Sequence, residues 1–144
     1  MIMKHRMVIV LALGALLLAL IAGPALAKVI DGTEGDDFLP GTAQNDRISG
    51  LGGNDELRGK LGDDTLRGGP DDDTLIGASG GDGLYGGTGR DDLLAGPGSD
   101  FVNSAEPTGV PAEKDFVDCG TGVDTAVVNP SDTVLKTCED VRKG

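Results

Sequence analysis

The sequence predicts an all-β fold, a parallel β-solenoid in which each coil contains two copies of a nine-residue unit. Three observations support this prediction. Residues 32–103 divide without insertion into eight consecutive nine-residue units. Position six of the unit is Asp in all eight copies and position eight is always aliphatic, so independent columns fix the register. Aromatic residues make up only 3% of the 144-residue chain, too few for an ordinary globular core, which favours a repetitive scaffold.

Residues 1–27 have the three parts of a secretory signal peptide. A basic stretch at residues 4–6 precedes an apolar run at residues 7–22, and a small-residue cleavage site ends at Ala27. We therefore expect cleavage after Ala27, a secreted, extracellular protein, and no membrane insertion after cleavage. The alternative is an uncleaved membrane anchor, but the run is at the short edge of a membrane span and is followed by the helix-breaking Pro24.

The chain is acidic, with 24 Asp and Glu against 12 Lys and Arg. This excess argues against nucleic acid or an anionic membrane surface as a partner and for cations. The alternative is that the acidity only keeps a secreted protein soluble. The acidic residues stand at fixed positions of the repeat and not in solvated blocks, which favours a specific role.

The predicted solenoid spans residues 28–103, of which residues 28–31 form an extended lead-in that we expect to cap its N-terminal end. Within a unit, glycines at positions one and four should supply positive φ angles for a tight turn, and positions seven to nine should form a short strand whose middle residue points inward. Odd units should stack into one parallel sheet and even units into another, around the position-eight residues Leu39, Ile48, Leu57, Leu66, Leu75, Leu84, Leu93 and Val102.

Stacking places the position-six aspartates in two columns, with neighbours about 4.8 Å apart. Like charges at that distance repel, and a divalent cation between them reverses the sign of the interaction. Calcium prefers carboxylate and carbonyl oxygens, whereas zinc is disfavoured because the only histidine, His5, lies in the signal peptide and both cysteines lie outside the repeats. The alternative for any single aspartate is an Asx-turn with its own backbone. The candidate metal ligands are Asp37, Asp46, Asp55, Asp64, Asp73, Asp82, Asp91 and Asp100.

The units resemble the RTX nonapeptide GGxGxDxUx, with U a large aliphatic residue, of hemolysin-type calcium-binding repeat proteins. The resemblance covers half of the chain and implies a right-handed parallel β-roll, with calcium held between stacked turns by position-six aspartates and turn carbonyls. Four aspartates in each column leave three gaps, so we expect about six calcium slots. Gln44 and Asp71 depart from the pattern by replacing the position-four glycine.

The pattern returns in weakened form after the eight units. Residues 104–114 contain two prolines and are predicted to form a loop, and residues 115–144 to form a C-terminal cap. Asp115 and Asp124 match position six and are secondary candidate ligands. Residues 133–135 are expected to add a last strand.

Cys119 and Cys138 are the only cysteines, and we expect them to form a disulfide. An exported protein usually pairs its cysteines, and their separation of 19 residues is close to one coil, which brings them within reach of each other. The alternative, a reactive thiol pair, lacks the CxxC spacing.

The sequence contains no GxSxG, HExxH or P-loop motif, so we expect a protein that is not an enzyme. The predicted function is a secreted calcium-binding protein that folds or is stabilised when it binds calcium. The alternative is an extracellular adhesive or surface-binding module, in which calcium is only structural and the strand faces recognise a carbohydrate, a wall polymer or another unknown partner.

Overall fold

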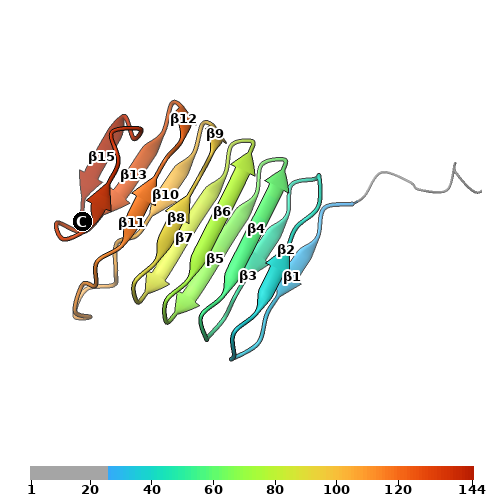
Figure 1. The fold of residues 1–144 in the computed structure, drawn as a ribbon, viewed down its shortest axis with the longest axis horizontal. Coiled ribbons are helices and arrows are strands. Elements are labelled where there is room, and N and C mark those ends of the chain that lie inside the picture. The colour runs from blue at the N-terminus through green and yellow to red at the C-terminus, as the bar shows by residue number, and fades with distance from the viewer. Residues whose placement is uncertain (1–25) are drawn as a thin grey trace, which may run out of the picture.

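The computed structural model describes residues 26–144, which form an all-β parallel solenoid (Figure 1). The predicted signal peptide at residues 1–27 lies, apart from its last two residues, outside the described residues. Residues 26–144 contain no helix that could cross a membrane. The strands are β1 Val29–Asp31, β2 Phe38–Pro40, β3 Arg47–Ser49, β4 Glu56–Leu61, β5 Thr65–Pro70, β6 Thr74–Ser79, β7 Gly83–Thr88, β8 Asp92–Leu94, β9 Pro97–Gly98, β10 Phe101–Asn103, β11 Phe116–Asp118, β12 Thr121–Gly122, β13 Thr125–Val128, β14 Thr133–Val134 and β15 Asp140–Lys143.

Two long parallel sheets face each other, because successive strands go alternately to one sheet and then to the other. One sheet has the order β1-β3-β5-β7-β10-β13-β15 and the other the order β14-β11-β8-β6-β4-β2. A small third sheet pairs β9 with β12 at a corner of the coils. In the repeat region, paired residues are one 18-residue coil apart, as Leu57 and Leu75 are. The predicted stacking of odd units on odd units and even units on even units is confirmed.

The core is a single layer of position-eight side chains between the two sheets. From Ile48 to Val102 these side chains are 0% exposed, and Val117 and Ala126 continue the layer into the C-terminal segment. At the N-terminal end, Ile30 and Leu39 are only partly buried, because no coil covers them from outside. The predicted inward direction of position eight is therefore confirmed along the roll.

The strands of the middle units are longer than predicted. Strands β4 to β7 each contain six residues and run from position seven of one unit to position three of the next. Position two has a positive φ angle in these units, for instance 90° at Lys60 and 79° at Ala78. The chain therefore turns a corner at position two while parallel pairing continues through it, for instance between Lys60 and Ala78 at the corner and between Leu61 and Ser79 after it. The prediction of three-residue strands was wrong for these units.

The predicted role of the position-one glycines was also wrong. None of those in the described repeats has a positive φ angle. Glycine is needed there because of close approach: a Cβ on Gly68 would collide with Asp73 Oδ2 and lie 2.7 Å from the carbonyl oxygen of Gly86.

Position four has the predicted positive φ in several units, at Gly53, Gly62, Gly80 and Gly89. Asp71, which replaces glycine at this position, still adopts a φ of 78°. Gly35, Gln44 and Gly98 lack a positive φ angle, so the first two units and the eighth unit turn differently at position four from the five units between them.

The C-terminal segment extends both sheets beyond the repeats. After the connection at residues 104–115, β11 pairs with β8 and β13 pairs with β10. The expected strand near residue 133 is present as β14, and β15, which was not predicted, closes the other sheet. The Cys119–Cys138 disulfide is confirmed, with the two Cα atoms 5.1 Å apart.

Candidate metal centre

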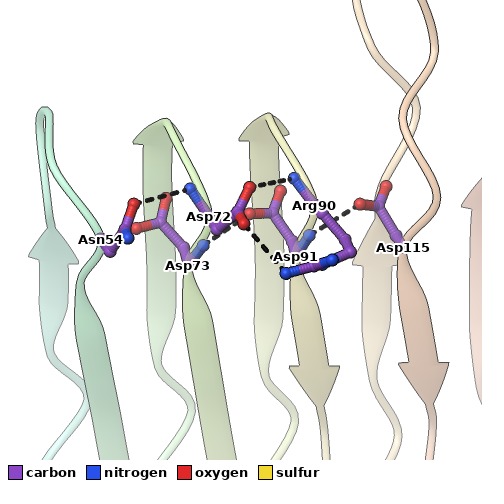
Figure 2. A network of polar contacts seen from close by, with 6 residues as sticks. All are labelled: Asn54, Asp72, Asp73, Arg90, Asp91 and Asp115. Atoms are coloured by element: carbon purple, nitrogen blue, oxygen red, sulfur yellow. Dashed lines mark hydrogen bonds and ion pairs between the residues drawn. The ribbon is translucent and has the colours of Figure 1, made fainter.

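The position-six aspartates form two continuous ladders along the roll. In each ladder, Oδ1 of one aspartate accepts a hydrogen bond from the backbone N–H of the aspartate one coil earlier. Asp73 Oδ1 accepts from Asp55 N–H at 2.8 Å, and Asp91 Oδ1 accepts from Asp73 N–H at 2.9 Å. Figure 2 shows Asp73, Asp91 and Asp115 in one such row. Each of these carboxylates accepts a hydrogen bond from the preceding coil, whereas in a simple Asx-turn it would bond only to its own local backbone.

The structure gathers the candidate ligands into the two predicted columns and extends both columns past the repeats. One column contains Asp37, Asp55, Asp73 and Asp91, and the other contains Asp46, Asp64, Asp82 and Asp100. Asp115 continues the first column by accepting from Asp91 N–H at 2.8 Å, and Asp124 continues the second by accepting from Asp100 N–H at 2.8 Å. The N-terminal end of the second column is the backbone N–H of Lys28, which donates to Asp46 Oδ1 at 2.7 Å.

The second carboxylate oxygen, Oδ2, is buried and unpaired in most of these aspartates. Asp64 and Asp73 are each 2% exposed, and Asp91 is fully buried. A buried anionic oxygen without a partner is costly, so each such atom calls for a proton or a cation. Within residues 26–144, the position-six aspartates whose Oδ2 has no hydrogen-bond partner are Asp55, Asp64, Asp73, Asp82, Asp91, Asp100, Asp115 and Asp124.

The pKa values of the buried aspartates reflect this environment. Burial, together with repulsion from the preceding aspartate in the column, raises the pKa of Asp73 and Asp91 to about 7, despite a backbone hydrogen bond to each that lowers it. Burial likewise raises the pKa of Asp115 to about 7 and that of Asp82 to about 6. The metal-free ladder is therefore poorly suited to holding its full negative charge.

The first coil, residues 32–49, satisfies its aspartates with threonine. Thr33 donates to Asp37 Oδ2 from its backbone N–H at 2.6 Å and from its hydroxyl at 2.9 Å. Thr42 makes the same two hydrogen bonds to Asp46 Oδ2, with the hydroxyl at 2.9 Å. Burial tends to raise the pKa of Asp46, but hydrogen bonds from Lys28 and Thr42 and the charge of Lys28 outweigh it, so this pKa is lowered.

A second ladder, formed by position five, was not predicted. Asn54 N–H donates to Asp36 Oδ1 at 2.9 Å, and Asp72 N–H donates to Asn54 Oδ1 at 3.1 Å. Arg90 ends this row with a backbone hydrogen bond to Asp72 and an ion pair to its other oxygen (Figure 2). Its donors point to the preceding coil, opposite to those of position six. The sequence held the signal, because position five is Asp or Asn in each of the first five units.

The donor chemistry of the gaps between stacked aspartates fits calcium. Each gap between two Oδ2-unpaired neighbours offers carboxylate oxygens, and the Gly86 carbonyl beside Asp73 shows that turn carbonyls lie close by. No three His, Cys, Asp or Glu side chains among residues 26–144 come together as a metal-binding group. A cation in these gaps would therefore take backbone carbonyls as well as carboxylates.

A comparison with protein-family models supports the same chemistry. The model described as the RTX calcium-binding nonapeptide repeat (4 copies) matches residues 31–66, 49–84 and 67–102, which together make up half of the chain. The chain belongs to the RTX calcium-binding nonapeptide repeat family. RTX repeats bind calcium, so this is a calcium-binding β-roll, and all eight repeat aspartates lie within the matched residues. No curated protein and no solved structure matches the chain.

Proposed function

We propose that this RTX roll is a secreted, non-enzymatic protein that folds or is stabilised when calcium enters the gaps between its stacked aspartates. The observation that carries the proposal is the row of buried, unpaired Oδ2 atoms. Without a cation these oxygens oppose the stacking of the coils, and a bound cation converts them into ligands. Binding free energy then adds to folding free energy.

The proposed ligands are the position-six aspartates together with turn carbonyls. Six of the eight repeat aspartates have an unpaired Oδ2, so each can serve the gap on either side of it. Asp37 and Asp46 belong to the same columns, but their Oδ2 atoms already accept hydrogen bonds. The calcium therefore serves the structure of the roll and is not poised for catalysis.

Two observations support secretion. RTX calcium-binding proteins are typically extracellular, and the Cys119–Cys138 disulfide is of the kind that persists in an oxidising compartment. The signal-like residues 1–27 supply an export route that agrees with both. The non-enzymatic role is supported by the generally structural character of RTX repeats.

The test is a calcium titration of the protein recovered from the culture medium. Circular dichroism should change from coil to β on adding millimolar calcium and return with a chelator. Magnesium at equal ionic strength should do much less, which separates ligation from charge screening. Calorimetry gives the number of ions bound. A spectrum that is fully β in excess chelator and unchanged by calcium would defeat the proposal.

A second candidate function, surface binding, is favoured by one observation on the outer face of the β1 to β15 sheet. Tyr85 lies 5.8 Å from the ring of Phe101, and the Arg67 guanidinium lies 5.3 Å from the Tyr85 ring. Tyr85 also lines a shallow groove between Pro70 and Pro107. Retention of the calcium-loaded protein on wall polysaccharide, lost in Tyr85→Ala and kept in Phe38→Ala on the opposite sheet, would support this function.

A further inference from the structure

We propose that the calcium sites of this roll are displaced by one coil from its repeats: they begin at Asp55 and Asp64 and end in the C-terminal segment at Asp115 and Asp124. This inference rests on the proposed function, because it states which gaps the calcium occupies. It follows from where the unpaired Oδ2 atoms begin and end along the two ladders.

The first coil is excluded because its aspartate oxygens are already bonded. Asp46 has both oxygens occupied, Oδ1 by the Lys28 N–H and Oδ2 by the N–H and hydroxyl of Thr42. Asp37 Oδ2 is bonded in the same way by Thr33. A cation beside either Oδ2 would have to displace two hydrogen-bond donors at once. The threonine groups thus occupy the place that a cation would take.

Position two decides this difference. Thr33 and Thr42 occupy it in the first two units, and neither has a positive φ angle. In the following units position two has a positive φ, as at Leu51 (84°) and Lys60 (90°), and lacks a hydroxyl. Among the described residues, none of the position-six aspartates from Asp55 to Asp100 accepts a hydrogen bond on Oδ2 from a position-two residue. Threonine at position two therefore marks a unit that does not need calcium.

The C-terminal segment is included because its two aspartates repeat the interior geometry. Asp115 and Asp124 are each 1% exposed, and the Oδ2 of each is unpaired within the described residues. Their Oδ1 atoms accept from Asp91 and Asp100 across a sequence separation of 24 residues, six more than a coil. The extra residues lie in the connection before β11 and leave the stacking unchanged.

The ladders then end at Asp132 and Glu139, which have no buried, unpaired carboxylate oxygen. Asp132 accepts from Asp115 N–H at 3.3 Å, and its other oxygen accepts from Ser104 and Asn129. Glu139 accepts from Asp124 N–H at 2.9 Å. Each column therefore has four aspartates with an unpaired Oδ2 and three gaps between them. The number of gaps equals that expected from the repeats, so the number of ions alone does not reveal the displacement.

The experiment compares two double variants of the secreted full-length protein, with bound calcium counted by calorimetry and native mass spectrometry. Asp115→Asn with Asp124→Asn should lose about two ions relative to the wild type, one from each end gap. Asp37→Asn with Asp46→Asn should keep the wild-type number. Asn retains the Oδ1 acceptor in both variants, so the ladder hydrogen bonds are preserved. The opposite pattern, with loss only in the first-coil variant, overturns the inference.

Two further measurements keep the result interpretable. Asp73→Asn, in the interior, should lose up to two ions, and an unchanged number there contradicts the proposed function itself and not merely the displacement. Thr33→Gly with Thr42→Gly removes the hydroxyl donors without changing an aspartate, and it gives position two the residue of Gly69 and Gly87, whose positive φ accompanies an unpaired Oδ2. This variant should therefore bind up to two additional ions. If the first coil already bound calcium in the wild type, no such gain would be possible, so an unchanged count in the glycine variant counts against the displacement.

Discussion

The first coil, residues 32–49, and the interior coils, residues 50–103, contain the same aspartates in the same stacked ladders, yet they treat the second oxygen differently. In the first coil Thr33 and Thr42 donate to it, whereas from Asp55 onward it is buried and unpaired. The aspartate column therefore fixes the stacking, and position two fixes the need for a cation. Two units with the same ligand residue are not two equal sites.

Removing calcium should have the largest effect, because the interior coils depend on calcium for their stability and the first coil does not. In a chelator, trypsin cleavage after Arg67 should accelerate by at least about a hundredfold, the factor for a single site, relative to calcium at a hundred times its dissociation constant. Magnesium at the same concentration should protect much less. Equal cleavage rates in calcium and in chelator would mean that the unpaired oxygens do not control stability.

The second-largest difference between the two regions is expected when a core leucine is replaced by alanine. Leu75→Ala in calcium should lower the free energy of unfolding by about 2–5 kcal/mol, because it opens a cavity in the fully buried layer. Leu39→Ala should cost about 1 kcal/mol, because Leu39 is only partly buried at the open end. Thermal unfolding of the two variants measures the difference. Similar losses would show that the N-terminal end is covered in solution.

The pH dependence of the metal-free protein should also distinguish the two regions, because the pKa of an interior aspartate is raised and that of a first-coil aspartate is lowered. Burial raises the pKa of Asp73 from 3.8 to about 7, so its contribution to stability is full below 3.8 and is lost as pH rises through 7. The pKa of Asp46 is lowered, so its contribution is present above 3.8 and lost as pH falls further.

Interior aspartates outnumber those of the first coil, so the β signal of the chelated protein in circular dichroism should fall between pH 4 and pH 8. Saturating calcium should reverse this slope, because calcium requires the carboxylates ionised. A chelated protein that becomes more stable toward pH 8 would contradict the burial of its unpaired oxygens.

The smallest effect is expected on the second ladder, which is formed by position five. Arg90→Ala removes an exposed ion pair to Asp72 but keeps the backbone hydrogen bond, so it should cost about 0.2–1 kcal/mol. Arg142→Ala, which removes the similarly exposed ion pair with Asp140 on β15, is the matched control. A loss of several kcal/mol for Arg90 alone would mean that the position-five ladder stabilises the turns as strongly as the position-six ladder does.

Much of the roll could be predicted because its main features repeat. A column such as Leu57, Leu75 and Leu93 reveals the core, and the spacing of Cys119 and Cys138 reveals the disulfide. Local backbone conformation could not be predicted in the same way. Nothing in the residue type of Lys60 predicts a φ of 90°, and this angle is what lengthens β4.

The division of the aspartates into bonded and unpaired ones was equally hidden. Threonine at position two of the first two units is visible in the sequence, but the bonds from the Thr42 N–H and hydroxyl to Asp46 Oδ2 also depend on the backbone conformation there, which is not. The position-five ladder, in contrast, was visible in the sequence as Asp or Asn at position five of the first five units, and it could have been predicted. β15 carries no repeat signature and was found only in the structure.

The ion pair between Arg90 and Asp72 also bears on how a nearly periodic chain finds one alignment. Most ladder contacts join like residues, so a chain that looped out one whole coil would restore nearly all of them in the shifted alignment. Arg90 is an exception, because a shift of one coil would place it beside the uncharged Asn54 and leave its guanidinium without a carboxylate on that edge. A single non-repeating side chain on the surface thus helps to distinguish the native alignment from its misaligned copies during folding.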